Sequence, residues 1–171
     1  MKNRFFIIFL VISVIFLSSC KGQEPKNAVC NEIVSKISEK EISLPAGKVY
    51  SKSATEGNDG YISQNMLCAI FGGGKELEIF ELWDDIALFL PSADHPCEII
   101  VIHCASVCDT SDTALVLTSR LSALKNAKCE KNPEYFDDCG VYIIKNYVLM
   151  IISSDAQNAL AIAKEAIKKG S

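Results

Sequence analysis

The chain has 171 residues, with 17 basic and 21 acidic side chains and a formal net charge of −4 at neutral pH. This length matches one ordinary domain and is sufficient to bury a hydrophobic core. The acidic balance argues against nucleic acid and anionic lipid headgroups as partners.

The first twenty residues have the pattern of a secretory signal. Lys2 and Arg4 precede an apolar run of 13 residues, 5–17, which only Ser13 interrupts. A membrane-spanning helix needs roughly 20 apolar residues, so this run is too short for a retained anchor. The pattern therefore predicts a signal peptide that is removed.

The apolar run ends in Leu17-Ser18-Ser19-Cys20, which resembles the lipobox of bacterial lipoprotein precursors. In those precursors the peptide before the Cys is removed, and the Cys carries a thioether-linked diacylglycerol. The resemblance implies cleavage between Ser19 and Cys20 and lipidation of Cys20. Because two acyl chains suffice for stable attachment, we expect the protein to be anchored by this lipid on the outer face of the cell membrane.

This interpretation divides the chain into three segments. Residues 1–19 are the signal peptide, residues 20–26 are the lipidated Cys with a short polar tether, and residues 27–171 are a single domain. Removing 19 residues from 171 leaves 152, and the loss of two basic residues changes the net charge from −4 to −6. We therefore expect no nucleic-acid partner.

The domain is expected to begin with two helices and a short strand. Apolar residues at spacings of three and four predict an amphipathic helix over residues 27–40. A short strand is expected over residues 48–50. A second helix, over residues 61–71, is predicted to end at the glycines 72–74.

The middle of the chain predicts two strands and a helix. Apolar runs over residues 86–90 and 97–104 are typical of buried strands, and their short connection favours an antiparallel pair. Asp84 and Asp85, before the first run, are expected to be solvated turn residues. Apolar residues at spacings of three and four then predict a helix over residues 110–127.

The C-terminal segment repeats this order of elements. Apolar runs over residues 141–144 and 147–152 flank a polar pair and predict a hairpin, which a helix over residues 156–169 follows. We therefore expect a single-domain α+β fold whose antiparallel sheet is built from two ββα units. The helices are expected mainly on one face, with the N-terminal helix added.

Three segments together resemble a known family. They are the strand 98–102, the helix that bears Arg120-Leu121, and the hairpin residues 146–148. They resemble uncharacterised, mostly lipobox-bearing lipoproteins of Gram-positive bacteria, catalogued as domain of unknown function 4358. The resemblance covers roughly residues 61–168. Since that family has no established activity, it implies no catalytic residues.

Glu98 and Arg120 also stand out on physical grounds. Glu98 opens an otherwise apolar strand, so its charge is expected to be half-buried and to need a partner. Arg120, on the covering helix, is a candidate for that partner. We expect either a structural ion pair or, alternatively, a carboxylate that binds a ligand.

Seven cysteines remain when Cys20 carries lipid, and an exported protein permits disulfides. Either Cys104 with Cys108 or Cys129 with Cys139 is a candidate disulfide. The alternative is a set of buried thiols that pack as small apolar side chains.

Histidines and cysteines gather in one short region. Two histidines and three cysteines lie within fourteen residues, and imidazole and thiolate are ligands of zinc and copper. Neighbouring residues on a strand point to opposite faces, however, and the spacings are not those of common zinc sites. We therefore expect no metal site. The five residues are His95, Cys97, His103, Cys104 and Cys108.

No sequence motif for catalysis or for a cofactor is evident, and neither an enzyme nor a cofactor is expected. The first functional hypothesis is an extracytoplasmic, membrane-anchored binding or accessory protein of the cell envelope, with an unknown protein or small molecule as ligand. The alternative hypothesis is a thiol- or metal-binding redox lipoprotein that uses the Cys97 to Cys108 region.

Overall fold

The computed structural model describes residues 29–40, 44–72 and 78–170. The predicted cleavage site at Ser19 and Cys20 and the tether lie outside these residues. Within them, no helix has both the length and the apolar character that a membrane span requires.

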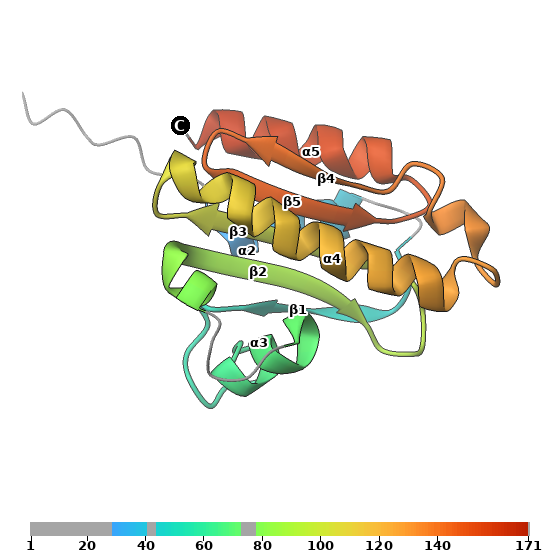
Figure 1. Ribbon diagram of the computed structural model, residues 1–171, viewed down its shortest axis with the longest axis horizontal. Helices are drawn as coiled ribbons and strands as arrows, with labels where there is room; N and C mark the ends of the chain where they lie inside the picture. The colour runs from blue at the N-terminus through green and yellow to red at the C-terminus, as the bar shows by residue number, and fades with distance from the viewer. Residues whose placement is uncertain (1–28, 41–43, 73–77, 171) are drawn as a thin grey trace, which may run out of the picture.

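The described residues form one antiparallel sheet of five strands, in the order β1-β2-β3-β5-β4 (Figure 1). This arrangement confirms the predicted single-domain α+β fold with an antiparallel sheet. The central strands β3 and β5 are buried along their whole length, and β1 and β4 form the two edges. The strands are β1 (Gly47–Ser51), β2 (Trp83–Pro91), β3 (Glu98–Cys104), β4 (Gly140–Ile144) and β5 (Tyr147–Ile152).

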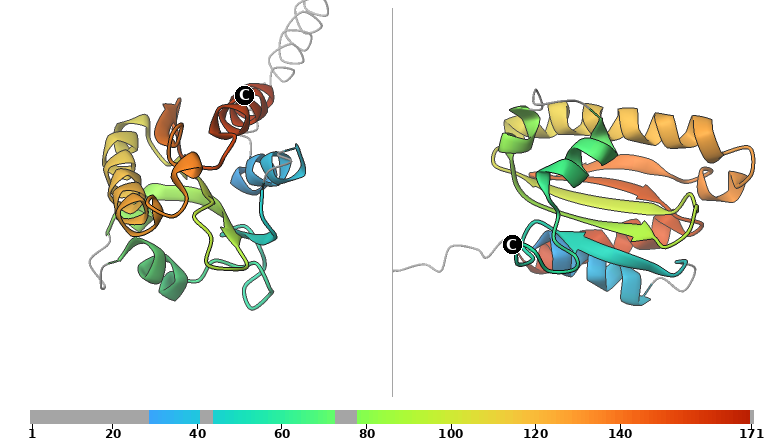
Figure 2. Two further views of the ribbon diagram at one scale, coloured as in Figure 1. Left: turned by 90° about the vertical axis from the view of Figure 1, so that its right-hand side faces the viewer. Right: turned by 90° about the horizontal axis from the view of Figure 1, so that it is seen from below.

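Helices cover both faces of the sheet (Figure 2). On one face lie α2 (Cys30–Lys40) and α5 (Ala156–Lys169), which pack side by side. On the other face lie α3 (Gln64–Phe71) and α4 (Thr110–Lys128), together with the short helix η1 (Glu78–Leu82). The expectation of helices mainly on one face is therefore wrong.

Two hydrophobic clusters, one on each face, explain the double coverage. Side chains alternate along a strand, and in β3 both sets are apolar: Ile99 and Val101 face α2 and α5, while Ile100 and Ile102 face α4. A strand that is apolar on both faces must be covered on both faces to remove its surface from water.

The two ββα segments are not equivalent units. The order strand, strand, helix does occur twice, as β2-β3-α4 and β4-β5-α5, with short 3-10 helices at Val107–Asp109 and Pro133–Tyr135. A two-fold rotation that exchanged the antiparallel strands β3 and β5 would keep both helices on one face. Because α4 and α5 lie on opposite faces, the predicted pair of ββα units is not confirmed.

Candidate functional site

Glu98 and Arg120 form a two-pronged ion pair between β3 and α4. The Arg120 Nη2 donates to Glu98 Oε2 at 2.8 Å, and Nε donates to Oε1 at 3.1 Å. The third guanidinium nitrogen, Nη1, donates to the carbonyl oxygen of Ile70 in α3 at 3.0 Å. One side chain thus joins β3, α4 and α3.

This geometry favours the structural interpretation of Glu98 over ligand binding. Glu98 is only 4% exposed, and both of its carboxylate oxygens already accept hydrogen bonds from Arg120. A planar guanidinium that meets a carboxylate with two parallel bonds fixes orientation as well as charge. The pair therefore sets the position of α4 on the sheet.

The structure contains no disulfide among its seven described cysteines, so neither predicted disulfide is formed. Cys104 points into the core, where its Sγ donates to Thr113 Oγ1 at 3.4 Å, whereas Cys108 is exposed. Cys129 and Cys139 both border the cluster under α4, and Cys139 Sγ donates to the carbonyl oxygen of Phe136. Burial raises the pKa of the Cys104 and Cys139 thiols, which keeps both in the unreactive thiol form at neutral pH.

Thiol-reagent kinetics on the full chain provide a direct test of this arrangement. We expect exposed Cys108 to react first and the fully buried Cys30, Cys97 and Cys104 to react only after denaturation. Cys108→Ala should remove the fast phase and leave the other phases unchanged. Rapid modification of Cys104 in the native protein would contradict the described packing.

The Cys97 to Cys108 region does not assemble a common site. Cys97 belongs to the cluster facing α2 and α5, and Cys104 belongs to the cluster facing α4. His95 lies edge-on to the Tyr135 ring, and its Nδ1 accepts from the Cys97 backbone N–H at 3.1 Å. The described residues bring no three metal-ligating side chains together. No specific observation favours the thiol or metal hypothesis.

A different polar cluster, at the end of the sheet where α2 begins, was missed from sequence. Asp85 lies opposite His103 in the β2–β3 pair, and its Oδ2 accepts the backbone N–H of Cys30 at 2.9 Å. Its Oδ1 accepts the N–H of Ile86 at 2.9 Å. A carboxylate at a helix N-terminus satisfies unpaired backbone N–H groups and complements the helix dipole. Asp85 is therefore a cap for α2 supplied from the sheet, not a solvated turn residue.

His103 is held between two polar side chains in the same cluster. Its Nε2 lies 2.8 Å from Asn146 Nδ2, and its Nδ1 lies 3.4 Å from Asp84 Oδ2. An amide nitrogen only donates, so Nε2 is the acceptor in the contact with Asn146, and Nδ1 faces Asp84. Tyr147 contacts the imidazole edge-on with ring centroids 4.7 Å apart.

This cluster contains the residue types of a thiol–histidine dyad but not an activated nucleophile. Cys30 is fully buried, and burial, the Asp85 charge and a hydrogen bond to Asp85 raise the pKa of its thiol well above the ordinary value. The reactive species in such a dyad is the thiolate. The cluster therefore acts to dock α2 on the sheet. Its residues come from segments that are far apart in the chain, so local sequence patterns could not predict it.

Replacing Asp85 by Ala tests the docking role. The loss of this cap is expected to lower the free energy of unfolding by about 1–2 kcal/mol, because the Cys30 N–H loses its acceptor. Denaturant titration of the full chain measures the change. Asp85→Asn keeps one oxygen acceptor and should lose less, and equal losses for both variants would contradict the capping role.

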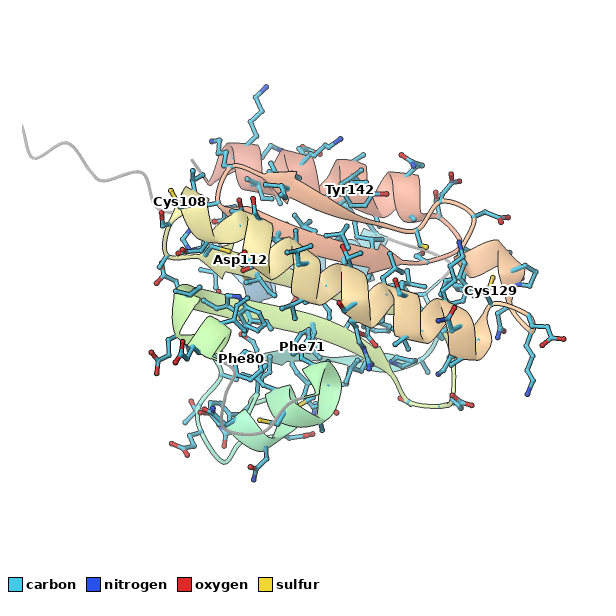
Figure 3. All side chains as sticks on the ribbon, in the orientation of Figure 1. Phe71, Phe80, Cys108, Asp112, Cys129 and Tyr142 are labelled. Atoms are coloured by element: carbon cyan, nitrogen blue, oxygen red, sulfur yellow. The ribbon has the colours of Figure 1, made fainter. Side chains whose placement is uncertain are left out.

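The same end of the molecule carries an open depression of about 570 Å³ between η1 and the first turn of α4. Glu78, Glu81 and Asp112 line it together with Ile79 and Leu82. Figure 3 shows Asp112 at this end of α4. Three carboxylates give the depression a negative potential, which disfavours anionic ligands.

No family model, curated protein or solved structure matches the chain. The resemblance to the lipoprotein family of segments 98–102, 120–121 and 146–148 therefore stays a prediction.

Proposed function

We propose that the protein is a lipoprotein anchored through Cys20 to the outer face of the cell membrane. Its domain acts there as a non-enzymatic binding or accessory protein of the cell envelope. The observation that carries the proposal is the N-terminal sequence, in which basic residues, a 13-residue apolar run and Leu17-Ser18-Ser19-Cys20 follow one another. The proposal includes no cofactor and no nucleic-acid partner.

The short segment between Cys20 and the first described helix supports this proposal. Cys30 opens α2 ten residues after Cys20, so the chain between them spans at most about 35 Å. The sheet end that carries Asp84 and the acidic depression therefore stays close to the membrane. Asp84 is 56% exposed, and carboxylates are repelled by anionic headgroups. Attachment accordingly depends on the lipid alone.

Substitution of Cys20 tests the anchor. In bacteria given a labelled fatty acid, the wild-type chain should become labelled and fractionate with membranes, whereas Cys20→Ala should lose the label completely and keep its signal peptide. Cys108→Ala, which changes the exposed cysteine of the described domain, is the matched control and should be labelled normally. Labelled Cys20→Ala protein would contradict the lipobox interpretation.

Affinity capture from intact cells tests the binding role. The tagged full chain is cross-linked at the cell surface, and the proteins it retains are compared with those retained by Cys20→Ala. A partner that requires the anchored form supports an envelope-binding role. Turnover of a cell-envelope substrate by the purified full chain would overturn the non-enzymatic role while leaving the anchor proposal intact.

A further inference from the structure

The two edge strands of the sheet are treated differently by the rest of the chain. At the β1 edge, a loop folds back over the strand: Ser51 N–H donates to the Gly60 carbonyl at 2.8 Å, and Ile62 N–H donates to the Ser51 carbonyl at 3.2 Å. Lys48 on the same strand pairs with Asp59. A covering loop and an edge lysine are devices that prevent edge-to-edge pairing. The β1 edge is therefore protected.

Strand β4 has no such protection among the described residues. Its neighbour in the sheet is β5, and no other described strand pairs with it. Gly140–Ile144 contains no charge and no proline, and its register with β5 is regular, without a bulge. Ile143 is 50% exposed, one of three large apolar side chains in the described residues that are so open. An unblocked apolar edge is a template for another strand.

The hairpin geometry identifies the backbone groups that face outward. Ile144 and Tyr147 flank the two-residue turn, so hydrogen-bonded pairs alternate from there along β4 and β5. Tyr142 and Gly140 therefore direct their N–H and C=O groups toward β5. Val141 and Ile143 direct theirs toward the open edge. These outward groups are the ones that a further strand would use.

We propose that the β4 edge pairs with the β4 edge of a second copy of this chain. In an antiparallel arrangement with Tyr142 opposite Tyr142, Val141 of each copy lies opposite Ile143 of the other. The outward groups then form about four backbone hydrogen bonds. The half-exposed Ile143 side chain is covered by Val141 of the second copy, because directly opposite residues share a face. The two sheets become one continuous sheet.

Charge complementarity favours a second copy as the occupant. Exposed Asp137 and Asp138 precede β4, and exposed Lys145 follows it. Antiparallel pairing brings the acidic end of each copy beside the basic end of the other, so the favourable contact occurs twice. A five-residue strand contributes much less than the roughly 1,200 Å² of a stable interface, and we therefore expect a weak, concentration-dependent pair.

The first test uses the full chain, produced in the same cells with two different epitope tags. After cross-linking of intact cells, capture of one tag should retrieve the other. Ile143→Lys, which places a charge on the edge, should reduce this retrieval at least about tenfold. Leu115→Lys, on the 66% exposed Leu115 of α4, is the matched control and should have no effect. Circular dichroism of each purified full chain checks that it is folded.

A charge exchange tests the register. Lys145→Asp and Asp138→Lys each place like charges together at both ends of a pair of identical copies, so each variant alone should lose cross-linking. When the two variants are mixed, both ends of the pair carry opposite charges again, and retrieval of one by the other should return toward the wild-type level. The proposal is overturned if the mixture cross-links no better than each variant alone, or if Leu115→Lys matches Ile143→Lys.

Discussion

Replacing Arg120 by Ala is expected to lower the free energy of unfolding by about 3–5 kcal/mol, because it leaves the buried Glu98 charge without its partner. The same change removes the hydrogen bond from Arg120 to the Ile70 carbonyl, which joins α4 to α3. Denaturant titration at neutral pH measures the loss. The change in heat-denaturation midpoint should follow it in the same direction.

Two further variants separate the charge from the shape of this contact. Glu98→Gln keeps a hydrogen-bond acceptor and should lose only about 1–3 kcal/mol. The double variant Glu98→Gln with Arg120→Met should lose less than Arg120→Ala, since no buried charge is left unpaired. If Arg120→Ala proves nearly neutral, the pair does not hold α4 in place, and a role for Glu98 in ligand binding regains support.

Replacing Trp83 by Ala is the second large change, with an expected loss of about 3–5 kcal/mol. Trp83 is 2% exposed, and its ring centroid lies 5.3 Å from that of Phe71 and 4.9 Å from that of Phe80. Figure 3 shows both phenylalanines near the β2 face that α3 covers. The variant opens a cavity and removes two aromatic contacts and one buried hydrogen bond.

The hydrogen bond of Trp83 is tested separately. Its Nε1 donates to Thr113 Oγ1 at 2.9 Å, and Cys104 Sγ donates to the same oxygen. Thr113→Val keeps the shape but leaves the buried indole N–H without an acceptor, so we expect a loss of about 1–3 kcal/mol. Trp83→Phe removes the donor and should lose less than Trp83→Ala. Equal stability of wild type and Thr113→Val would show that this bond contributes nothing.

Local periodicity was sufficient to predict most of the elements. The spacing of Leu117, Leu121 and Leu124 predicted a helix over 110–127, and the structure has Thr110–Lys128. The hairpin around Lys145 and Asn146 was predicted with the strand bounds that the structure shows, except that β4 begins one residue earlier, at Gly140. These segments carry their signal in neighbouring residues, which is where periodic patterns and turn preferences act.

What sequence could not supply was the contact between distant segments. The apolar run 86–90 predicted a strand but not its first residues. In the structure β2 begins at Trp83, and residues 83–85 join the sheet through an irregular register with β3. From sequence alone, Asp85 resembled an ordinary turn residue. Its capping role depends on the contact with Cys30 of α2, which is 55 residues away in the chain. For Glu98 and Arg120 the sequence predicted either an ion pair or a ligand-binding carboxylate, since an isolated charge in an apolar strand requires compensation, and the structure forms the ion pair.

The side-by-side packing of α2 and α5 limits the order in which the protein acquires its structure. These helices are the first and last of the described domain, and together they cover one face of the sheet. During synthesis, this face cannot be fully covered until α5 has emerged, because α5 follows all five strands in the chain. Contacts between segments so far apart in the chain also slow folding. The hydrophobic cluster on this face is therefore expected to be completed last during synthesis.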